Sequence, residues 1–403
     1  MTAFLRKDHN NSAMMFPNRR RKTMLGNEIK NYIEEHAAET YELLKTIAVI
    51  PAPSNHEEKR AQFLYNLLKE WGAENVYIDA ALNVIFPYVD DGSEDLTVFM
   101  AHTDVVFPDT EELPLYEDGD RLCCPGIGDD TANVAAMLMV VRYLLLHPLK
   151  PKHGGILFVC NSGEEGLGNL KGVRSICTRY GERMKRFYSF DGQLDGIVNQ
   201  AVGSSRFRVS ADTIGGHSYG CFGNPNAIAG LSRVISEIYD ITVPEFGKTT
   251  YNVGTISGGT SVNTIAQHAE MLCEYRSDDV RGLDIMSRRF ATIFNNRNTD
   301  RVRLSVEVVG ERPCGSLQAD TQEVQDEMLA RAVSLLHEYT GKKIEVSAGS
   351  TDCNIPLSMN IPSLCYGFYY GDGAHTREEY IEISSLKTGY YAAFESILDY
   401  FVC

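Results

Sequence analysis

The stretch "LTVFMAHTD", residues 96–104, decides the fold class. Its apolar run from Val98 to Ala101 is unbroken, which is typical of a strand buried on both faces of a parallel sheet. Two later segments have the same character, "GGILFVCN" (154–161) and "RFYSFD" (186–191). A strongly apolar segment at 131–147 predicts a helix before the strand at 154–161. Strands alternating with helices predict an α/β domain whose mostly parallel central sheet is flanked by helices.

The pattern changes near Gly203, where polar and apolar residues begin to alternate, as in "SSRFRVSAD" (204–212) and "AEMLCEYRS" (269–277). This texture predicts an inserted α+β domain over residues 205–313. Residues 27–204 and 314–403 are then the two parts of the first domain. The basic patch "NRRRK" (18–22) is followed by no apolar stretch, so we expect residues 1–26 to be a disordered lead rather than a signal peptide.

The composition is that of a globular protein and excludes several partners. The 403 residues are 43% hydrophobic and 23% charged, and the formal net charge is -16. Such a charge repels phosphate backbones and anionic membrane surfaces, so we expect neither nucleic acid nor a membrane as partner. Ten cysteines without a CxxC pair predict reduced thiols. With no signal peptide expected, the sequence predicts a cytoplasmic protein.

Side chains that can bind metal or carry protons follow several of the predicted strands. Because parallel strands bring their carboxyl ends to one edge of the sheet, we expect these side chains to lie near one another. They are His102 and Asp104 after the first strand, Glu164 and Glu165 after the second, Asp191 after the third, Asp129 and Asp130 before the apolar helix, and His375 in a late glycine-rich loop.

Each of these residues also has an ordinary structural explanation. A strand-end histidine can be hydrogen-bonded in the interior, and an acidic pair before a helix can cap it. Adjacent glutamates commonly lie in solvated loops. Asp191 can belong to a turn with Gly192, and His375 can be exposed and inactive. Because all of them fall at strand-to-loop junctions of one sheet, a shared site is the better interpretation.

Two imidazoles and several carboxylates form a nitrogen and oxygen donor set that suits zinc, cobalt or manganese. If Asp129 bridges two divalent ions, then Glu165, Asp191 and a shared hydroxide balance the remaining positive charge. Paired metal ions acidify a water and polarise a carbonyl, which is the chemistry of amide hydrolysis. Glu164 would remain free to relay a proton.

Several motifs, in this order and spacing, resemble one family. They are "AHTD" (101–104), "GIGDD" (126–130), "SGEEGLG" (162–168), "FDG" (190–192) and "GDGAHTREEY" (371–380), with "GGHS" (215–218) between the last two. The set resembles the dinuclear zinc peptidases that include peptidase T, carboxypeptidase G and succinyl-diaminopimelate desuccinylase. The resemblance runs from about residue 28 to the end of the chain, and the set is highly specific, although "GEEG" alone is not.

The resemblance implies a role for each motif residue. It makes His102 and Asp191 ligands of one metal, and Glu165 and His375 ligands of the other. Asp129 would bridge the two ions. Two further roles follow from the same match: Asp104 orients His102, and Glu164 is the general base. The family also implies a cis peptide bond between Asp129 and Asp130.

The inserted domain resembles the family's lid and dimerisation domain. There His217 would help bind the substrate's carbonyl oxygen in the neighbouring subunit, which implies a homodimer; a helix-capping surface histidine is the alternative. Asn263 and Arg276 are candidates for holding the oxyanion or a substrate carboxylate, although a strand-end arginine can be a surface charge. Ser350 and Thr351 in "GSTDCN" resemble a substrate-facing loop and can equally be turn residues.

Asp191 favours one subgroup of the family. At this position the aminopeptidases and dipeptidases tend to have aspartate, and the deacylases and carboxypeptidases glutamate. We therefore expect an aminopeptidase that acts on short peptides, of the tripeptidase or dipeptidase type. The alternative enzyme is an N-acyl amino acid deacylase or a carboxypeptidase on the same scaffold. The alternative that is not an enzyme is a catalytically inactive, metal-dependent binding subunit. The sequence has no HExxH or GxxxxGK motif.

Overall fold

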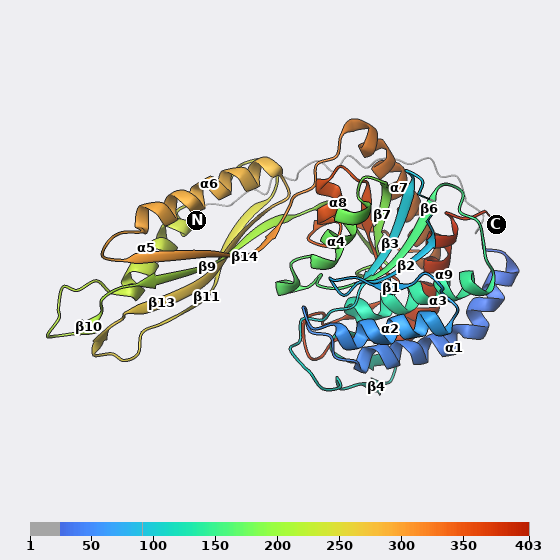
Figure 1. Ribbon diagram of the computed structural model, residues 1–403, viewed down its shortest axis with the longest axis horizontal. Coiled ribbons are helices and arrows are strands. Elements are labelled where there is room, and N and C mark those ends of the chain that lie inside the picture. Colours follow the sequence, from blue (N-terminus) through green and yellow to red (C-terminus); the bar gives the residue numbers. More distant parts are fainter. Residues whose placement is uncertain (1–24, 91, 403) are drawn as a thin grey trace, which may run out of the picture.

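The computed structural model describes residues 25–90 and 92–402 (Figure 1). The expected disordered lead lies outside these residues except for its last two. Of these, Leu25 is buried against the core and Gly26 precedes the first helix. The described chain forms two lobes, one built on an eight-stranded sheet and the other on a four-stranded sheet (Figure 1).

The eight-stranded sheet has the order β1-β2-β6-β3-β7-β16-β8-β15. Its four central strands run parallel, while the β1–β2, β2–β6 and β16–β8 pairings are antiparallel. The mostly parallel α/β sheet predicted from the sequence is therefore confirmed. The strands are β1 (Tyr77–Ile78), β2 (Val84–Val89), β3 (Leu96–His102), β6 (Gly155–Asn161), β7 (Met184–Ser189), β8 (Gly196–Ala201), β15 (Glu345–Gly349) and β16 (Ser363–Cys365).

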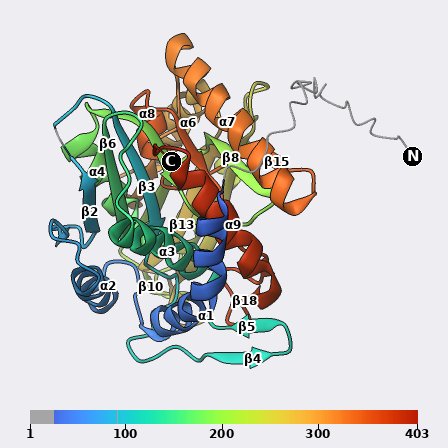
Figure 2. The ribbon, with the colours of Figure 1, turned by 90° about the vertical axis from the view of Figure 1, so that its right-hand side faces the viewer.

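Helices cover both faces of this sheet, which explains why its central strands are apolar throughout. All seven residues of β3 are buried; Phe99 and Ala101 face one core, and Val98 and Met100 face the other. On the first face α1, α3 and α9 lie side by side (Figures 1 and 2). That core also includes α2 and α7, whereas α4 and α8 pack on the second face. The helices are α1 (Asn27–Val49), α2 (Glu58–Glu70), α3 (Asn133–Leu146), α4 (Lys171–Tyr180), α7 (Ala319–Thr340), α8 (Asn354–Ser358) and α9 (Ile383–Leu398).

The second lobe has a core of its own. Its antiparallel sheet has the order β11-β13-β9-β14, and α5 and α6 pack on it (Figure 1). In β13 every second residue is buried, the pattern of a sheet covered on one face only. The elements are β9 (Gly203–Asp212), β11 (Thr249–Gly258), β13 (His268–Ser277), β14 (Arg303–Arg312), α5 (Ala227–Tyr239) and α6 (Val280–Arg297), with a short pair, β10 (Gly216–His217) and β12 (Thr264–Ile265), at the far end.

Short elements complete the described chain. A small sheet joins β4 (Tyr116–Asp118), β5 (Arg121–Cys123), β17 (Gly371–Asp372) and β18 (Tyr380–Glu382), and two helical turns lie at η1 (Ile127–Ala132) and η2 (Gly166–Gly168). Nine cysteines of the described chain are free thiols, and all of them except Cys221 are buried. Within the described residues, no helix is long and apolar enough to cross a membrane.

Candidate metal centre

Three neighbouring parallel strands end at the same edge of the large sheet and place acidic and imidazole groups there. β3 lies between β6 and β7. His102 is the last residue of β3, Glu164 and Glu165 follow the end of β6, and Asp191 follows the end of β7. This is the edge at which open α/β sheets place their ligands.

The carboxylate of Asp129 lies between two imidazoles. Its Oδ1 is 2.9 Å from Nε2 of His102, and its Oδ2 is 3.1 Å from Nε2 of His375. His375 Nε2 is also 3.2 Å from Oε1 of Glu165. Each carboxylate oxygen of Asp129 therefore has a different histidine beside it.

The donor atoms form two groups that share Asp129. Asp129 combines with His102 and Asp191 in one group, and with Glu165 and His375 in the other. Within each group the donor atoms lie within 4.8 Å of one another. A further group joins Glu164 to His102 and Glu165, so Glu164 lies beside the donors. The structure thus brings together all six residues that the sequence predicts for the metals and the general base.

The geometry and chemistry of these donors fit divalent metal ions. Two atoms bound to one tetrahedral zinc at about 2.0–2.1 Å lie about 3.3 Å apart, close to the 2.9–3.2 Å separations around Asp129. Oε1 of Glu165 is buried and, despite its approach to His375, makes no hydrogen bond of acceptable geometry within the part of the chain that the structure describes. A buried acceptor without a hydrogen bond is costly unless a cation occupies the position.

The electrostatics of the cluster also call for added positive charge. Burial raises the pKa of Glu165 to about 7, although His375 opposes the shift. Burial and Asp129 raise the pKa of Asp191 well above its usual range. For Asp129, by contrast, burial is outweighed by His102 and His375, which hold its pKa below the usual range. Carboxyl groups this close stay ionised together only beside cations, and two divalent ions would supply that charge.

Asp104 has a different set of contacts from the one expected. Nδ1 of His102 lies 3.1 Å from the main-chain oxygen of Asp104 but 3.7 Å from its carboxylate. The carboxylate instead accepts the backbone N–H groups of Glu164 at 2.9 Å and Glu165 at 3.0 Å. It also accepts the hydroxyl of Ser54. Asp104 therefore orients His102 through its backbone and holds the two glutamates through its side chain.

The peptide bond between Asp129 and Asp130 is cis, as the resemblance implies. The carboxylate of Asp130 is not part of the donor groups. Its Oδ2 accepts the backbone N–H of His102 at 2.9 Å, and its Oδ1 accepts a hydrogen bond from Asn133 at 2.7 Å. The acidic pair is thus not a helix cap, because one carboxylate joins the donors and the other fixes the end of β3.

Glu379 is a residue of the site that sequence reasoning missed. Its side chain is buried and accepts three backbone N–H groups, from Gly126 at 2.6 Å, Gly128 at 2.9 Å and Asp129 at 2.8 Å. Glu379 lies in the same segment as His375, and its carboxylate fixes the loop that carries Asp129. The motif "GDGAHTREEY" contains it, but the spacing gives no sign of which glutamate is buried.

Replacing Glu379 with glutamine is expected to weaken metal binding by roughly 10- to 100-fold, the usual cost of losing a group that orients a ligand. The amide places an N–H₂ against a backbone N–H, so the loop carrying Asp129 is held less firmly. Competition with a chromophoric zinc chelator measures the affinity. The exposed neighbour Glu378, replaced in the same way, serves as control. Equal zinc affinity in Glu379→Gln and the native protein would contradict this role.

The expected substrate loop lies next to the acidic cluster. The hydroxyl of Ser350 is 3.1 Å from Nη1 of Arg312. The same nitrogen is 3.1 Å from Oε1 of Glu164. Arg312 is the second residue of the site that sequence reasoning missed. Thr351 has the contacts of a turn residue: its N–H donates to Asn354, and its hydroxyl accepts the N–H of Cys353. Arg312 ends a strand far away in sequence, so no spacing rule could associate it with Glu164.

The three candidates from the inserted segment lie on the second lobe. His217 is exposed in β10 at the far end of that lobe, and the next residue, Ser218, donates its N–H to the main-chain oxygen of Asn263 (Figure 1). Arg276 lies on β13 and bonds to Glu274 through Nε at 2.7 Å and Nη2 at 3.1 Å. β10 lies at the end of the second lobe that is remote from the large sheet (Figure 1).

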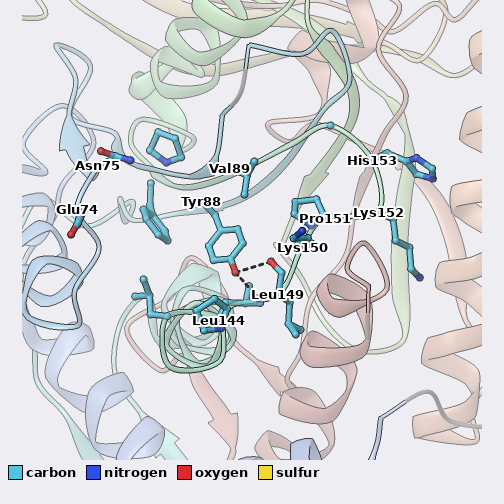
Figure 3. Close-up of a pocket in the computed structure, with 15 residues that line it drawn as sticks. Glu74, Asn75, Tyr88, Val89, Leu144, Leu149, Lys150, Pro151, Lys152 and His153 are labelled. Carbon is cyan, nitrogen blue, oxygen red and sulfur yellow. Dashed lines mark hydrogen bonds between the residues drawn. The ribbon is translucent and has the colours of Figure 1, made fainter.

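A surface cavity of about 640 Å³ lies elsewhere on the large lobe, between β2, the end of α3 and the segment 148–154 (Figure 3). In it the hydroxyl of Tyr88 donates to the main-chain oxygen of Leu149 and accepts the N–H of the same residue. None of the residues lining this cavity belongs to the donor groups around Asp129. The chemistry therefore points to the sheet edge and not to this cavity.

Comparisons with known proteins agree with this geometry. Residues 98–399 match the family described as Peptidase family M20/M25/M40. A succinyl-diaminopimelate desuccinylase of Corynebacterium glutamicum is 24% identical over 353 residues, which cover 85% of this chain and 92% of the relative.

Two solved structures are similar in fold. The aminopeptidase PepT from Bacillus cereus superposes with a TM-score of 0.63 and 22% identity, covering 89% of this chain and 97% of that one. Bacillus subtilis YXEP, described as a dinuclear metal binding peptidase from the M20 family, gives a TM-score of 0.61 and 16% identity, covering 91% and 99%. At these identities the likeness concerns the fold alone.

Proposed function

Because the chain belongs to peptidase family M20/M25/M40 and is a metallopeptidase, we propose that it removes the amino-terminal residue from short peptides such as tripeptides and dipeptides. The observation that carries the proposal is the pair of donor groups that share Asp129. The choice of chain end is supported by Asp191, the residue type that aminopeptidases and dipeptidases of the family tend to have at this position.

We assign one metal position to His102, Asp191 and Asp129, and the second to His375, Glu165 and Asp129. Nitrogen and oxygen donors in these numbers suit zinc first, and cobalt or manganese next. Two such ions, when bound, polarise the scissile carbonyl and lower the pKa of a water between them.

Glu164 is the proposed general base. Its carboxylate is buried beside His102 and Glu165, within the group of donors but outside the two groups that share Asp129. Its backbone N–H is fixed by Asp104. A carboxylate held there can take a proton from the attacking water and deliver it to the leaving amine.

A panel of substrates tests the proposed specificity. Unblocked tripeptides are expected to be cleaved after the first residue at least 100-fold faster, in kcat/KM, than the same peptides with an acetylated amino terminus. Product identification by mass spectrometry reads the bond that is cut. Turnover restricted to N-acylated amino acids, or release of the carboxyl-terminal residue, would contradict an aminopeptidase.

A deacylase is the second candidate, favoured by the similarity to a protein named succinyl-diaminopimelate desuccinylase. The same donor groups would serve it, because an N-acyl amino acid also presents an amide carbonyl. The two candidates differ only in the group that supplies the carbonyl of that bond. In an aminopeptidase substrate it is an amino acid with a free amino group, and in a deacylase substrate it is an acyl group. N-succinyl and N-acetyl amino acids in the panel therefore separate them.

We also propose a homodimer in which the second lobe serves the neighbouring subunit. His217 and Asn263 would contact the substrate carbonyl there, while Arg276, Ser350 and Thr351 would help to hold the peptide. Exposed apolar side chains close to β10 and β12 support an interface, since such patches commonly mark protein contacts. They are Ile214, Tyr219, Phe222 and Val262. The composition supports placing this dimer in the cytoplasm.

Mixing two inactive variants tests this arrangement. His217→Ala and Glu164→Gln are each expected to be nearly inactive alone. Their heterodimer has one intact site, made of Glu164 from one subunit and His217 from the other. After co-expression, activity is therefore expected to recover to roughly a quarter of the native value by random pairing. Mixtures no more active than the separate variants would show that His217 does not act across the dimer.

A further inference from the structure

Arg312 occupies the point where the chain leaves the second lobe. It is the last residue of β14, where it pairs with Ser204 of β9. The chain then continues through residues 313–318 to α7 of the large lobe. Although arginine is usually exposed, this side chain is buried.

The guanidinium of Arg312 binds one residue of the centre at two points. Nη1 donates to Oε1 of Glu164 at 3.1 Å, and Nη2 donates to the main-chain oxygen of the same residue. Nη1 also lies 3.1 Å from the hydroxyl and 3.4 Å from the main-chain oxygen of Ser350. One planar fork therefore joins β14, the loop after β6 and the loop after β15.

This contact is enclosed and directional. The side chains of Arg312 and Glu164 are 6% and 7% exposed, so water does not compete strongly for either group. Nε of Arg312 is buried and has no hydrogen-bond partner among the described residues. The side chain is therefore oriented by its two Nη groups, that is, by Glu164 and Ser350. A rigid guanidinium that grips both the backbone and the carboxylate of one residue limits the rotamers of that residue.

Other contacts tie the same loop region to the second lobe. The N–H of Glu311 donates to Oδ1 of Asn169 at 3.0 Å, and Arg174 donates to the main-chain oxygen of Glu311. Arg206 of β9 donates to the main-chain oxygen of Gly166 at 3.2 Å. These contacts involve residues that follow the glutamate pair in the chain, and none of them involves the carboxylate of Glu164. Arg312 differs from them because it reaches the carboxylate of Glu164 itself.

We propose that Arg312 is a positioning residue for Glu164, through which the second lobe sets the orientation of the base. The inference rests on the proposed function of Glu164. With Oε1 held by the guanidinium, the carboxylate plane is fixed and Oε2 is left to exchange the proton. An acceptor misplaced by about 1 Å can cost roughly 100-fold in rate, so a fixed orientation has a direct effect on turnover.

The test compares Arg312→Met and Arg312→Lys with the native protein on an unblocked tripeptide. Arg312→Met is expected to lower kcat roughly 10- to 100-fold, with KM within about twofold and metal content unchanged. Arg312→Lys keeps the charge but not the planar pair of donors, so its kcat is expected to lie between those of Arg312→Met and the native protein. If the methionine variant does not fold, the lysine variant carries the test, and a native kcat for it would overturn the proposal. Arg208→Met is the matched control, since Arg208 lies on the same sheet and bonds to Glu307.

A double-mutant cycle separates positioning from a structural role. In a Glu164→Gln background, Arg312→Met is expected to cause no further loss of kcat, because the arginine acts through the carboxylate that is already gone. An undiminished loss in that background would overturn the proposal. Native activity of Glu164→Gln alone would instead refute the proposed base, so the two failures are distinguishable.

Discussion

Replacing Asp129 with asparagine is expected to remove both metal ions and to lower kcat/KM by roughly 10³- to 10⁴-fold. Asp129 has one carboxylate oxygen beside His102 and the other beside His375, so its charge serves both donor groups. Metal ions contribute several kcal/mol to stabilising the transition state, which corresponds to a rate factor of this size. Elemental analysis of the dialysed variant, combined with tripeptide hydrolysis, measures both effects.

The control for this variant is Asp118→Asn, which removes an exposed carboxylate of β4 outside the donor groups. It is expected to keep the native metal content and rate. Retention of one ion by Asp129→Asn would restrict Asp129 to a single metal. Retention of both ions and of activity would contradict its place at the centre of the site.

Replacing Glu164 with glutamine is expected to lower kcat by roughly 10²- to 10⁴-fold while both metal ions stay bound. This is the contribution of a general base in a well-positioned site. Glutamine keeps the size of the side chain and an oxygen that can accept the hydrogen bond from Arg312. The loss then reports the missing proton acceptor and not a collapsed loop. Single-turnover kinetics with metal analysis of the same sample makes the measurement.

The neighbouring variant Glu165→Gln provides the contrast. Glu165 belongs to the donor group of His375 and Asp129, so its loss is expected to lower metal content as well as rate. Added zinc is expected to restore part of the activity of Glu165→Gln and none of that of Glu164→Gln. Equal rescue of both variants would contradict the separate roles of the two glutamates.

The large sheet and its donor residues could be predicted from the sequence because both depend on short segments. The run before His102 identifies a strand buried on two faces, and a parallel sheet brings the ends of its strands together. The motifs then place Glu165 and Asp191 without knowledge of any distant contact. This local information also led to the resemblance that the family match confirms.

The contacts that support the site could not be predicted, because they join distant parts of the chain. Arg312 and Glu164 are 148 positions apart, and Glu379 and Gly128 are 251 apart. Neither pair has a characteristic spacing, and both arginine and glutamate are usually surface residues. Asp104 shows the same limit at short range. Its proximity to His102 is evident from the sequence, but its two hydrogen bonds to the glutamate loop appear only in the folded chain.

A metal titration tests the central claim most directly. The protein is stripped with a chelator, zinc is added in steps, and hydrolysis of an unblocked tripeptide is measured at each step. We predict that activity is absent without metal and reaches its plateau at two ions per chain, the number that the donor groups sharing Asp129 can hold. A plateau at one ion per chain, or hydrolysis by the metal-free protein, would contradict a two-metal peptidase.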